Sequence, residues 1–471
     1  MLFNSFRFLF VFLPVAALGY HFCARRVSAR AAQFFLIVAS LAFYSAAKPA
    51  YAPLLLGSIL ANYALARAIV RLEGKARKRM LIFGLTANIA FLASFKYLNL
   101  ILRNISSLAA GHFYLPDWEF PLGISFFTLQ QVMYLVDCYE KLVPANDWIT
   151  HAAWVSFFPT VTSGPLTRAR QLVPQLKNGV TAAAPAVTQA ITLIAVGLFK
   201  KVVFADSFSR IADAGFAHPA ALSAAEAWIS SFAYTFQIYF DFSGYSDMAI
   251  GAALLLGIAI PVNFNTPYRS LSIIEFWQRW HITLSQFITT YLYTPIIRSF
   301  RNATLGAAAI STLLAMTIAG IWHGPAFTFL LFGFLHGVGL AGNQVWRKRI
   351  KIAIPKPLSW AITLLFVNLT FVFFRSPSVI AALHICRSLL PAHGMLSTAV
   401  LRESIRFSEA QVIVLPVLAG VLVALIGRNS NSILEEPQPN LRMGFAVSAL
   451  LLIAFLFMNS TIAKEFVYFA F

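Results

Sequence analysis

Charged residues are scarce in this chain of 471 residues. Lys, Arg, Asp and Glu together make up 11% of it, whereas a soluble globular domain carries about 25%. Among the charged residues Asp and Glu are the less common, with 17 against 36 Lys and Arg. Hydrophobic residues reach 59%, and the mean hydropathy is +0.74. This composition excludes a soluble globular protein. It predicts an integral membrane protein built as a single membrane domain, residues 1–471.

Cysteine and the common catalytic motifs are also rare or missing. The three cysteines, Cys23, Cys138 and Cys386, lie far apart, so they indicate neither a disulfide framework nor a CxxC metal site. There is no HExxH motif, and we expect no bound metal. The absence of a GxSxG elbow and of a Walker-type loop argues against an acyl-serine enzyme and an ATPase. No internal repeat is visible, which weakens a secondary-transporter interpretation.

Basic residues outnumber acidic ones, and the formal net charge is +19. They occur in short clusters between apolar runs, so they form no continuous surface for nucleic acid. Positive charge beside membrane spans is typical of cytoplasmic loops. We therefore expect loops 23–30 and 71–79 in the cytoplasm and loop 103–118 outside.

Apolar runs long enough to cross a bilayer, about 20 residues each, recur along the chain. The first run is expected to be a retained span, because no A-x-A cleavage site precedes the basic residues 25–30. Its N-terminus is expected outside, because those basic residues follow the span. The predicted spans are 5–22, 31–47, 50–70, 79–102, 185–204, 225–255, 305–322, 325–345, 358–376, 411–427 and 443–460.

Three other apolar segments are too short, too polar or too interrupted by proline to face lipid. They are residues 119–140, 150–165 and 271–300. Such segments are typically interfacial, re-entrant or buried within the bundle. The fold class predicted is therefore an all-α polytopic membrane protein, with a central funnel or cavity rather than a plain ring of helices.

Polar residues interrupt the span at 231–250, which reads SFAYTFQIYFDFSGYSDMAI. Asp241, Ser243, Tyr245 and Asp247 are costly to place in apolar surroundings. They could brace neighbouring helices as a structural cluster, or they could line a substrate path.

A second polar run, NFNTPYRSLSIIEFWQRWHITLS, occupies residues 263–285. Glu275 and Arg279 are four residues apart, so they share a helix face and can pair. Arg279, Trp280 and His281 follow one another in a run too polar for an aromatic belt alone. We expect a functional role for His281.

The third candidate is His323, at the end of an apolar span and directly before Gly324 and Pro325. The helix should break here and leave space beside the imidazole. Histidine can take a proton from a hydroxyl and return it, although a buried histidine can equally be a hydrogen-bonded structural group. His336, 13 residues further on, is interpreted as structural.

Together these segments resemble a known family. FDFSGYSDMAIG, NFNTPYRS, EFWQRWHITLS, the WHG at 322–324 and the LHG at 335–337 are similar to the membrane-bound O-acyltransferase family. PLGISFFTLQQVMYLVDCY at 121–139, FFPTVTSGPLTRARQLVPQL at 157–176 and GLFKKVVFADS at 197–207 resemble its bacterial branch, which O-acetylates exported polysaccharides such as alginate. The resemblance covers most of residues 5–376, with its core at about 120–376.

The resemblance implies a fold and a set of site residues. The fold is a ring of about 11 or more transmembrane helices, with re-entrant or interfacial helices around a central funnel. The residue matching the family's catalytic histidine is His323, and His281 matches a second important polar position. The residues that could support them or line a substrate path are Asp241, Tyr245, Asn265, Arg279, Trp280 and His336.

The function implied is a membrane O-acyltransferase of the bacterial inner membrane. It would pass an acyl group, expected to be acetyl, from a cytoplasmic thioester across the membrane for O-acetylation of an exported, alginate-like polysaccharide. The donor would be acetyl-CoA or an acyl carrier protein, with no permanently bound cofactor, and a periplasmic or extracellular acetyltransferase partner would complete the transfer. The alternatives are a transporter or flippase of an acyl donor or glycan, and a scaffold subunit of an export complex.

Overall fold

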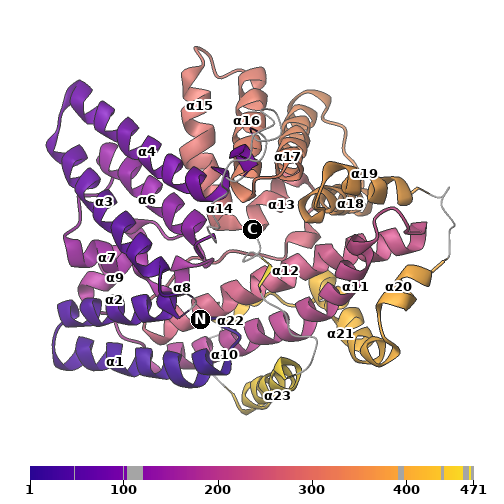
Figure 1. Ribbon diagram of the computed structural model, residues 1–471, viewed down its shortest axis with the longest axis horizontal. Coiled ribbons are helices and arrows are strands. Elements are labelled where there is room, and N and C mark those ends of the chain that lie inside the picture. Colours follow the sequence, from indigo (N-terminus) through magenta and orange to yellow (C-terminus); the bar gives the residue numbers. More distant parts are fainter. Residues whose placement is uncertain are drawn as a thin grey trace. The chain divides into compact units, whose positions relative to one another are not determined.

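The computed structural model describes residues 1–46, 48–98, 100–102, 105, 120–390, 397–435, 440–459 and 466–467. These segments are helical or connecting, and no strand occurs among them, which confirms the all-α prediction (Figure 1). The predicted outer loop 103–118 lies almost wholly outside the described residues. The chain divides into two compact units, which are described separately below.

Eight helices of the described chain are long and apolar enough to cross a membrane. They coincide with eight of the eleven predicted spans, so the protein is a multi-pass membrane protein. The other three predicted spans are also helices, namely α2 (Ala29–Ser45), α12 (Ala224–Leu255) and α17 (Phe327–Val345). The number of spans, the ring, the funnel and the single domain remain predictions.

The first unit consists chiefly of Met1–Ile194 with Ser246–Pro261. Long helices make up its N-terminal half, and α1 packs on α2 and α3 on α4 (Figure 1). Shorter helices follow, and α6 among them is buried along most of its length, as predicted for 119–140. The helices of this unit are η1 (Phe8–Phe12), α1 (Leu13–Arg26), α2, α3 (Tyr51–Arg71), α4 (Gly74–Lys96), α6 (Ile124–Tyr139), α7 (Trp148–Ser156), α8 (Phe158–Val161), α9 (Ala169–Asn178) and most of α10 (Ala184–Phe199).

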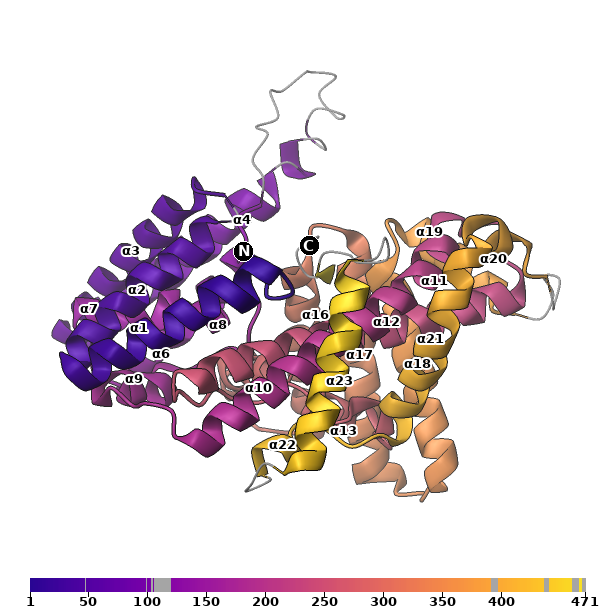
Figure 2. The same ribbon diagram turned by 90° about the horizontal axis from the view of Figure 1, so that it is seen from below.

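The second unit holds Ala195–Tyr245 and most of the chain from Val262 onward. Its helices α21 and α23, orange and yellow in Figure 2, expose large apolar side chains such as Leu415 and Phe445, as expected of surfaces that meet lipid. The remaining elements of this unit are η2 (Lys200–Ala205), α11 (Asp206–Ala217), the larger part of α12, η3 (Pro267–Arg269), α13 (Ile273–Arg279), α14 (Ile282–Phe287), η4 (Ile288–Tyr293), α15 (Thr294–Ser299), α16 (Leu305–His323), α17, η5 (Trp346–Ile350), α18 (Lys356–Arg375), α19 (Val379–Ser388), α20 (Ala399–Ser404), α21 (Phe407–Ile426), α22 (Ser432–Glu435) and α23 (Leu441–Met458).

Helix α12 is buried along almost all of residues 231–253. Its carboxylates and hydroxyls therefore face protein rather than lipid, and neighbouring groups can satisfy them. Within residues 271–300, α13 is a short helix, whereas α14, η4 and α15 follow one another without a break and make residues 282–299 continuously helical. Ser272 caps α13 by accepting a hydrogen bond from the backbone N–H of Glu275, which starts that helix directly before the Arg279–His281 run.

Helices α16 and α17 form a close antiparallel pair. Gly320 on α16 and Gly333 on α17 face each other so closely that a Cβ on Gly320 would lie 2.7 Å from the Gly333 Cα. Small residues let two helix backbones approach in this way. The predicted helix break is confirmed: α16 ends at His323, Gly324 is extended, and α17 begins at Phe327.

Candidate active site

His281 lies in a turn that hydrogen bonds to residues 263–265 hold in place. The backbone N–H of Asn265 donates to the carbonyl of Arg279 at 2.9 Å, and the N–H of Ile282 donates to the carbonyl of Asn263 at 2.9 Å. Between these two bonds His281 adopts a left-handed backbone conformation, with φ of +42°. Such a conformation is costly for a residue with a Cβ, and the two hydrogen bonds to residues 263–265 enforce it.

The imidazole of His281 is buried, with 1% of the residue exposed. Its Nδ1 lies 3.2 Å from the Oδ1 of Asn263, and the ring meets Phe242 edge-on at 4.6 Å between centroids. Burial lowers the pKa of His281 to about 3. The imidazole is therefore neutral near pH 7, which is the form that can accept a proton.

Trp280 is part of an aromatic layer beside His281. Its indole packs against three phenyl rings, with distances between ring centroids of 5.1 Å to Phe264, 5.5 Å to Phe276 and 5.3 Å to Phe371. The residue is buried and ends α13, with its backbone N–H donating to the carbonyl of Phe276. We interpret Trp280 as a closely packed side chain that holds the turn containing His281 in position.

Arg279 and Asn265 lie at the edge of this turn. Arg279 pairs with Glu275 at 2.8 Å, as their spacing predicted, and its guanidinium also donates to Thr266 at 3.2 Å. Asn265 is exposed, and its Oδ1 accepts a hydrogen bond from Asn429 at 2.7 Å. Both side chains join neighbouring segments to the turn.

His323 is buried at the break between α16 and α17. Aromatic rings surround it: Trp322 at 4.9 Å, Phe374 at 5.2 Å and Phe332 at 6.0 Å, all edge-on. Phe374 is 6.4 Å from Phe371, the ring that also packs on Trp280. The two histidine segments are thus joined through one continuous aromatic layer.

His336 lies one ring further on, 4.6 Å from Phe332, and both of its nitrogens have partners. The indole N–H of Trp277 donates to Nδ1 at 3.1 Å. Nδ1 is therefore unprotonated, so in the neutral ring Nε2 carries the proton and donates to Thr370 Oγ1 at 3.0 Å. The Thr370 hydroxyl in turn donates to Val367, and the chain of bonds is complete. This geometry supports the structural interpretation of His336.

Asp241 and Tyr245 lie on the buried face of α12. The Oδ1 of Asp241 is 3.1 Å from the Nζ of Lys201, and the same Nζ pairs with Asp206 at 2.6 Å. The other carboxylate oxygen of Asp241 accepts a hydrogen bond from the backbone N–H of Val467 at 2.6 Å. Tyr245 stacks on Phe466 at 4.4 Å. Of the two roles left open by the sequence, these contacts favour bracing of helices and of the C-terminal segment over a substrate path.

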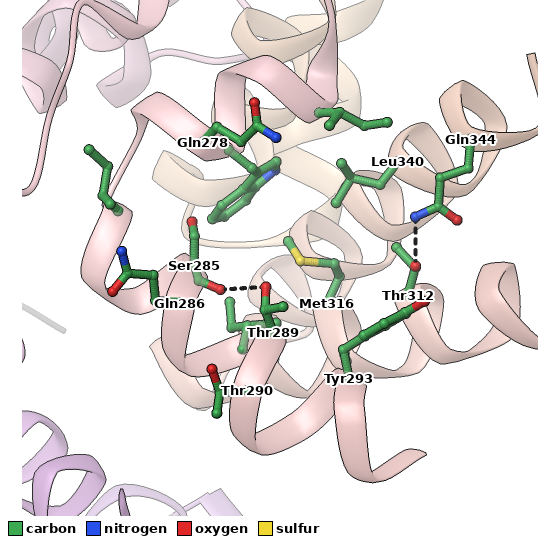
Figure 3. A pocket seen from close by; sticks show the side chains of 15 residues that line it. Gln278, Ser285, Gln286, Thr289, Thr290, Tyr293, Thr312, Met316, Leu340 and Gln344 are labelled. Carbon is green, nitrogen blue, oxygen red and sulfur yellow. Dashed lines mark hydrogen bonds between the residues drawn. The ribbon is translucent and has the colours of Figure 1, made fainter. Parts of the chain in front are cut away.

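A cavity of about 530 Å³ opens beside the helix that follows His281. Ser285 and Thr289 line one side of it, and Thr312 and Met316 of α16 line the other (Figure 3). Side-chain amides, hydroxyls and apolar groups line it, and no charged side chain is among the described residues that do so. The volume is within the range of small-molecule sites.

Metal ligands are not gathered in the described part of the chain. No group of three or more His, Cys, Asp or Glu side chains there is placed to hold a metal ion. The side chains around His281 and His323 offer acid–base groups and hydrogen-bond donors instead.

Sequence reasoning missed Asn263 and Lys201. Asn263 is the first Asn of NFN, and only its pairing with residues 281–283 distinguishes it from the predicted Asn265. Lys201 is one of two adjacent lysines at 200–201, and from the sequence such a short basic cluster beside an apolar run indicates membrane topology. Its burial between two carboxylates could be inferred only from the packing of η2 on α12.

This chain is similar to known proteins over most of its length. The model of the membrane-bound O-acyltransferase family matches residues 80–384. A peptidoglycan O-acetyltransferase of Helicobacter pylori is 34% identical over 100% of this chain and 98% of its own length. A probable alginate O-acetylase of Pseudomonas aeruginosa is 35% identical over 80% of this chain and 73% of its own. A teichoic acid D-alanyltransferase of Bacillus subtilis is 26% identical over 54% and 66%. The chain belongs to the membrane-bound O-acyltransferase family.

Proposed function

We propose that this membrane acyltransferase carries acetyl groups from a thioester donor on the cytoplasmic side of the bacterial inner membrane to hydroxyls of an exported glycan. The observation that carries the proposal is the placement of His323 in an aromatic, water-poor surrounding at the break between α16 and α17. Membership of an acyltransferase family argues against the transporter and scaffold alternatives.

His323 acts as the general base in this proposal. A ring nitrogen removes the proton of the acceptor hydroxyl, and the oxygen attacks the thioester carbonyl. The C–S bond then breaks, and the leaving thiolate takes the proton back from the imidazolium. The products are an O-acetyl ester and a free thiol, and the histidine is again neutral.

His281 supports the reaction as a neutral group rather than as a cation. Its lowered pKa keeps the ring uncharged over the physiological range. A neutral imidazole can hydrogen-bond a reactant or share developing charge without first losing a proton. We propose that His281 makes this hydrogen bond to the donor or to the acceptor.

The cavity between α14, η4 and α16 is the proposed site for the arm of the donor. It adjoins both the helix that follows His281 and the helix that ends at His323. Its uncharged lining of amides, hydroxyls and apolar side chains suits an extended chain of amide and methylene groups ending in a thioester. Acetyl-CoA and an acyl carrier protein both present such a chain, and no permanently bound cofactor is needed.

The acceptor is proposed from the relatives. The peptidoglycan O-acetyltransferase matches this chain from end to end, whereas the probable alginate O-acetylase matches 80% of it. Peptidoglycan is therefore the first acceptor to examine, followed by an alginate-like secreted polysaccharide. A periplasmic or extracellular acetyltransferase partner is proposed to complete the transfer, because a membrane-embedded site reaches a polymer poorly.

The test is the alkali-labile acetate of purified peptidoglycan and of secreted polysaccharide, compared between wild type and His323→Ala at matched membrane levels. We expect a loss of acetate from one polymer of at least about a hundredfold, the range of a general-base contribution. The matched control is His384→Ala, which alters a histidine of α19 far along the chain from the site. Deletion of the gene is measured alongside. Acetate that is lost in the deletion strain but fully restored by His323→Ala would overturn the mechanism, whereas acetate that the deletion leaves unchanged on every polymer would overturn the acetyl assignment.

A further inference from the structure

The side-chain atom of Asn263 that contacts His281 can be identified from the other hydrogen bonds that it makes. Its Oδ1 accepts the backbone N–H of Thr283 at 3.2 Å and the Thr283 hydroxyl at 2.9 Å. A backbone N–H can only donate, so the side-chain atom at this position is the oxygen and not the amide nitrogen. The same oxygen lies 3.2 Å from His281 Nδ1.

The oxygen of an amide side chain carries no proton. The hydrogen between it and His281 must therefore belong to Nδ1, which makes the neutral ring the Nδ1–H tautomer. In that tautomer Nε2 has the lone pair. Nε2 is then the nitrogen that can accept a proton or a hydrogen bond, while Nδ1 is committed to Asn263.

The amide nitrogen of Asn263 shows that this arrangement is not optimised for stability. Asn263 is 1% exposed, and its Nδ2 has no hydrogen-bond partner among the described residues. Burying a donor without a partner costs free energy. An apolar side chain of similar volume would avoid that cost, but it could not bind His281.

We propose that Asn263 is the positioning residue of His281, holding the ring in the Nδ1–H tautomer so that Nε2 is the reactive nitrogen. This inference rests on the proposed function, because it assumes that His281 acts in the acyl transfer. Asn263 also shapes the backbone of the turn, since its carbonyl accepts the N–H of Ile282. That backbone bond survives substitution by leucine, so Asn263→Leu removes only the three contacts of Oδ1, namely those with His281 Nδ1, the Thr283 N–H and the Thr283 hydroxyl.

The first experiment reads the tautomer directly. The full-length protein in detergent micelles or nanodiscs is labelled with nitrogen-15 histidine, and the signal of His281 is assigned by its loss in His281→Gln. We expect a protonated Nδ1 and a bare Nε2 in the wild type. Asn263→Leu should lose this state, and Asn263→Asp, which keeps an acceptor oxygen, should retain it. A wild-type signal with the proton on Nε2 would overturn the proposal.

The second experiment separates positioning from simple stability. Acetyl transfer from radiolabelled acetyl-CoA is measured in inside-out membrane vesicles containing equal amounts of folded protein. Asn263→Leu should lower kcat by about a hundredfold while KM for the donor changes less than about threefold, as expected when geometry is lost and ground-state binding is not. Asn263→Asp should recover at least about a tenth of the wild-type kcat.

Thr283→Val is the matched control, because it removes a hydrogen bond to the same oxygen but leaves the bond to His281. It should keep the tautomer and most of kcat. Equal losses in Thr283→Val and Asn263→Leu would assign Asn263 a structural role only. If His281→Gln and His323→Ala both retain full activity, the proposed function fails instead, whatever the tautomer.

Discussion

His281 and His336 are both buried, yet their hydrogen bonds suit them to different tasks. His336 has both nitrogens engaged, by the indole of Trp277 and the hydroxyl of Thr370, so a proton transferred to or from it would break an established bond. His281 commits Nδ1 to Asn263. At the scale of the residue, hydrogen-bond partners discriminate between histidines that the sequence presents as equals.

Replacement of His336 therefore tests a structural role. His336→Leu leaves the buried indole N–H of Trp277 without its acceptor, which should lower the free energy of unfolding by about 1–3 kcal/mol. The activity of the folded fraction should stay near that of the wild type. Thermal unfolding in detergent, paired with acetyl transfer per folded molecule, measures both quantities. A large loss of activity at an unchanged melting temperature would place His336 in the reaction.

Lys201 shows the opposite case, a charge used for structure. It is buried between Asp206 and Asp241, in the π-helical segment η2 that lies against α21 and α23. A buried ion pair adds little net stability, but removal of one partner leaves a charge uncompensated. The two ion pairs therefore link η2 to α12 through Asp241.

At the scale of the element, the α16 and α17 pair controls the position of His323. A Cβ added to Gly333 would lie 2.4 Å from the carbonyl oxygen of Met316, a backbone atom that cannot move aside. The close packing of these two helices therefore depends on the absence of a side chain at this position.

Gly333→Ala should separate the two helices and lower stability by about 1–3 kcal/mol, with a further loss of activity because His323 moves with α16. Gly342→Ala on the same helix is the matched control, since nothing lies within 4 Å of its added Cβ. The control should be neutral or slightly stabilising, because alanine favours a helix by up to about 1 kcal/mol over glycine. Melting temperatures of the two variants decide the matter: equal values would contradict the packing argument.

At the scale of the whole molecule, the distribution of basic residues predicts orientation in the membrane. The first two turns of α4 carry Lys75, Arg77, Lys78 and Arg79, and positive charge near spans is retained in the cytoplasm. The donor thioester is proposed to come from that same side.

Orientation can be measured by cysteine labelling. In a variant in which the three native cysteines are replaced by alanine or serine, Lys75→Cys should react with a membrane-impermeant maleimide in inside-out vesicles and not in intact spheroplasts. A cysteine at Ser28, in the loop between α1 and α2, should behave in the same way. Labelling of both positions in intact spheroplasts would reverse the proposed direction of transfer.

The sequence by itself determined that this is an all-α membrane protein, where its long helices lie, and which family it belongs to. These conclusions follow from local properties: runs of apolar residues, clusters of basic residues, proline and glycine at the helix break after His323, and contiguous motifs around His281 and His323. The spacing of Glu275 and Arg279 predicted their ion pair for the same reason.

Only the tertiary structure decided which polar side chains meet. Asn263 lies 18 residues before His281, and Lys201 lies 40 residues before Asp241, so neither contact follows from helix or strand periodicity. The choice of Asn263 over Asn265, of Nδ1 over Nε2, and of bracing over a substrate path for Asp241 depends on how distant segments pack. In a largely apolar interior each polar atom must find one of few available partners, and the fold, not the local sequence, determines which partner is within reach.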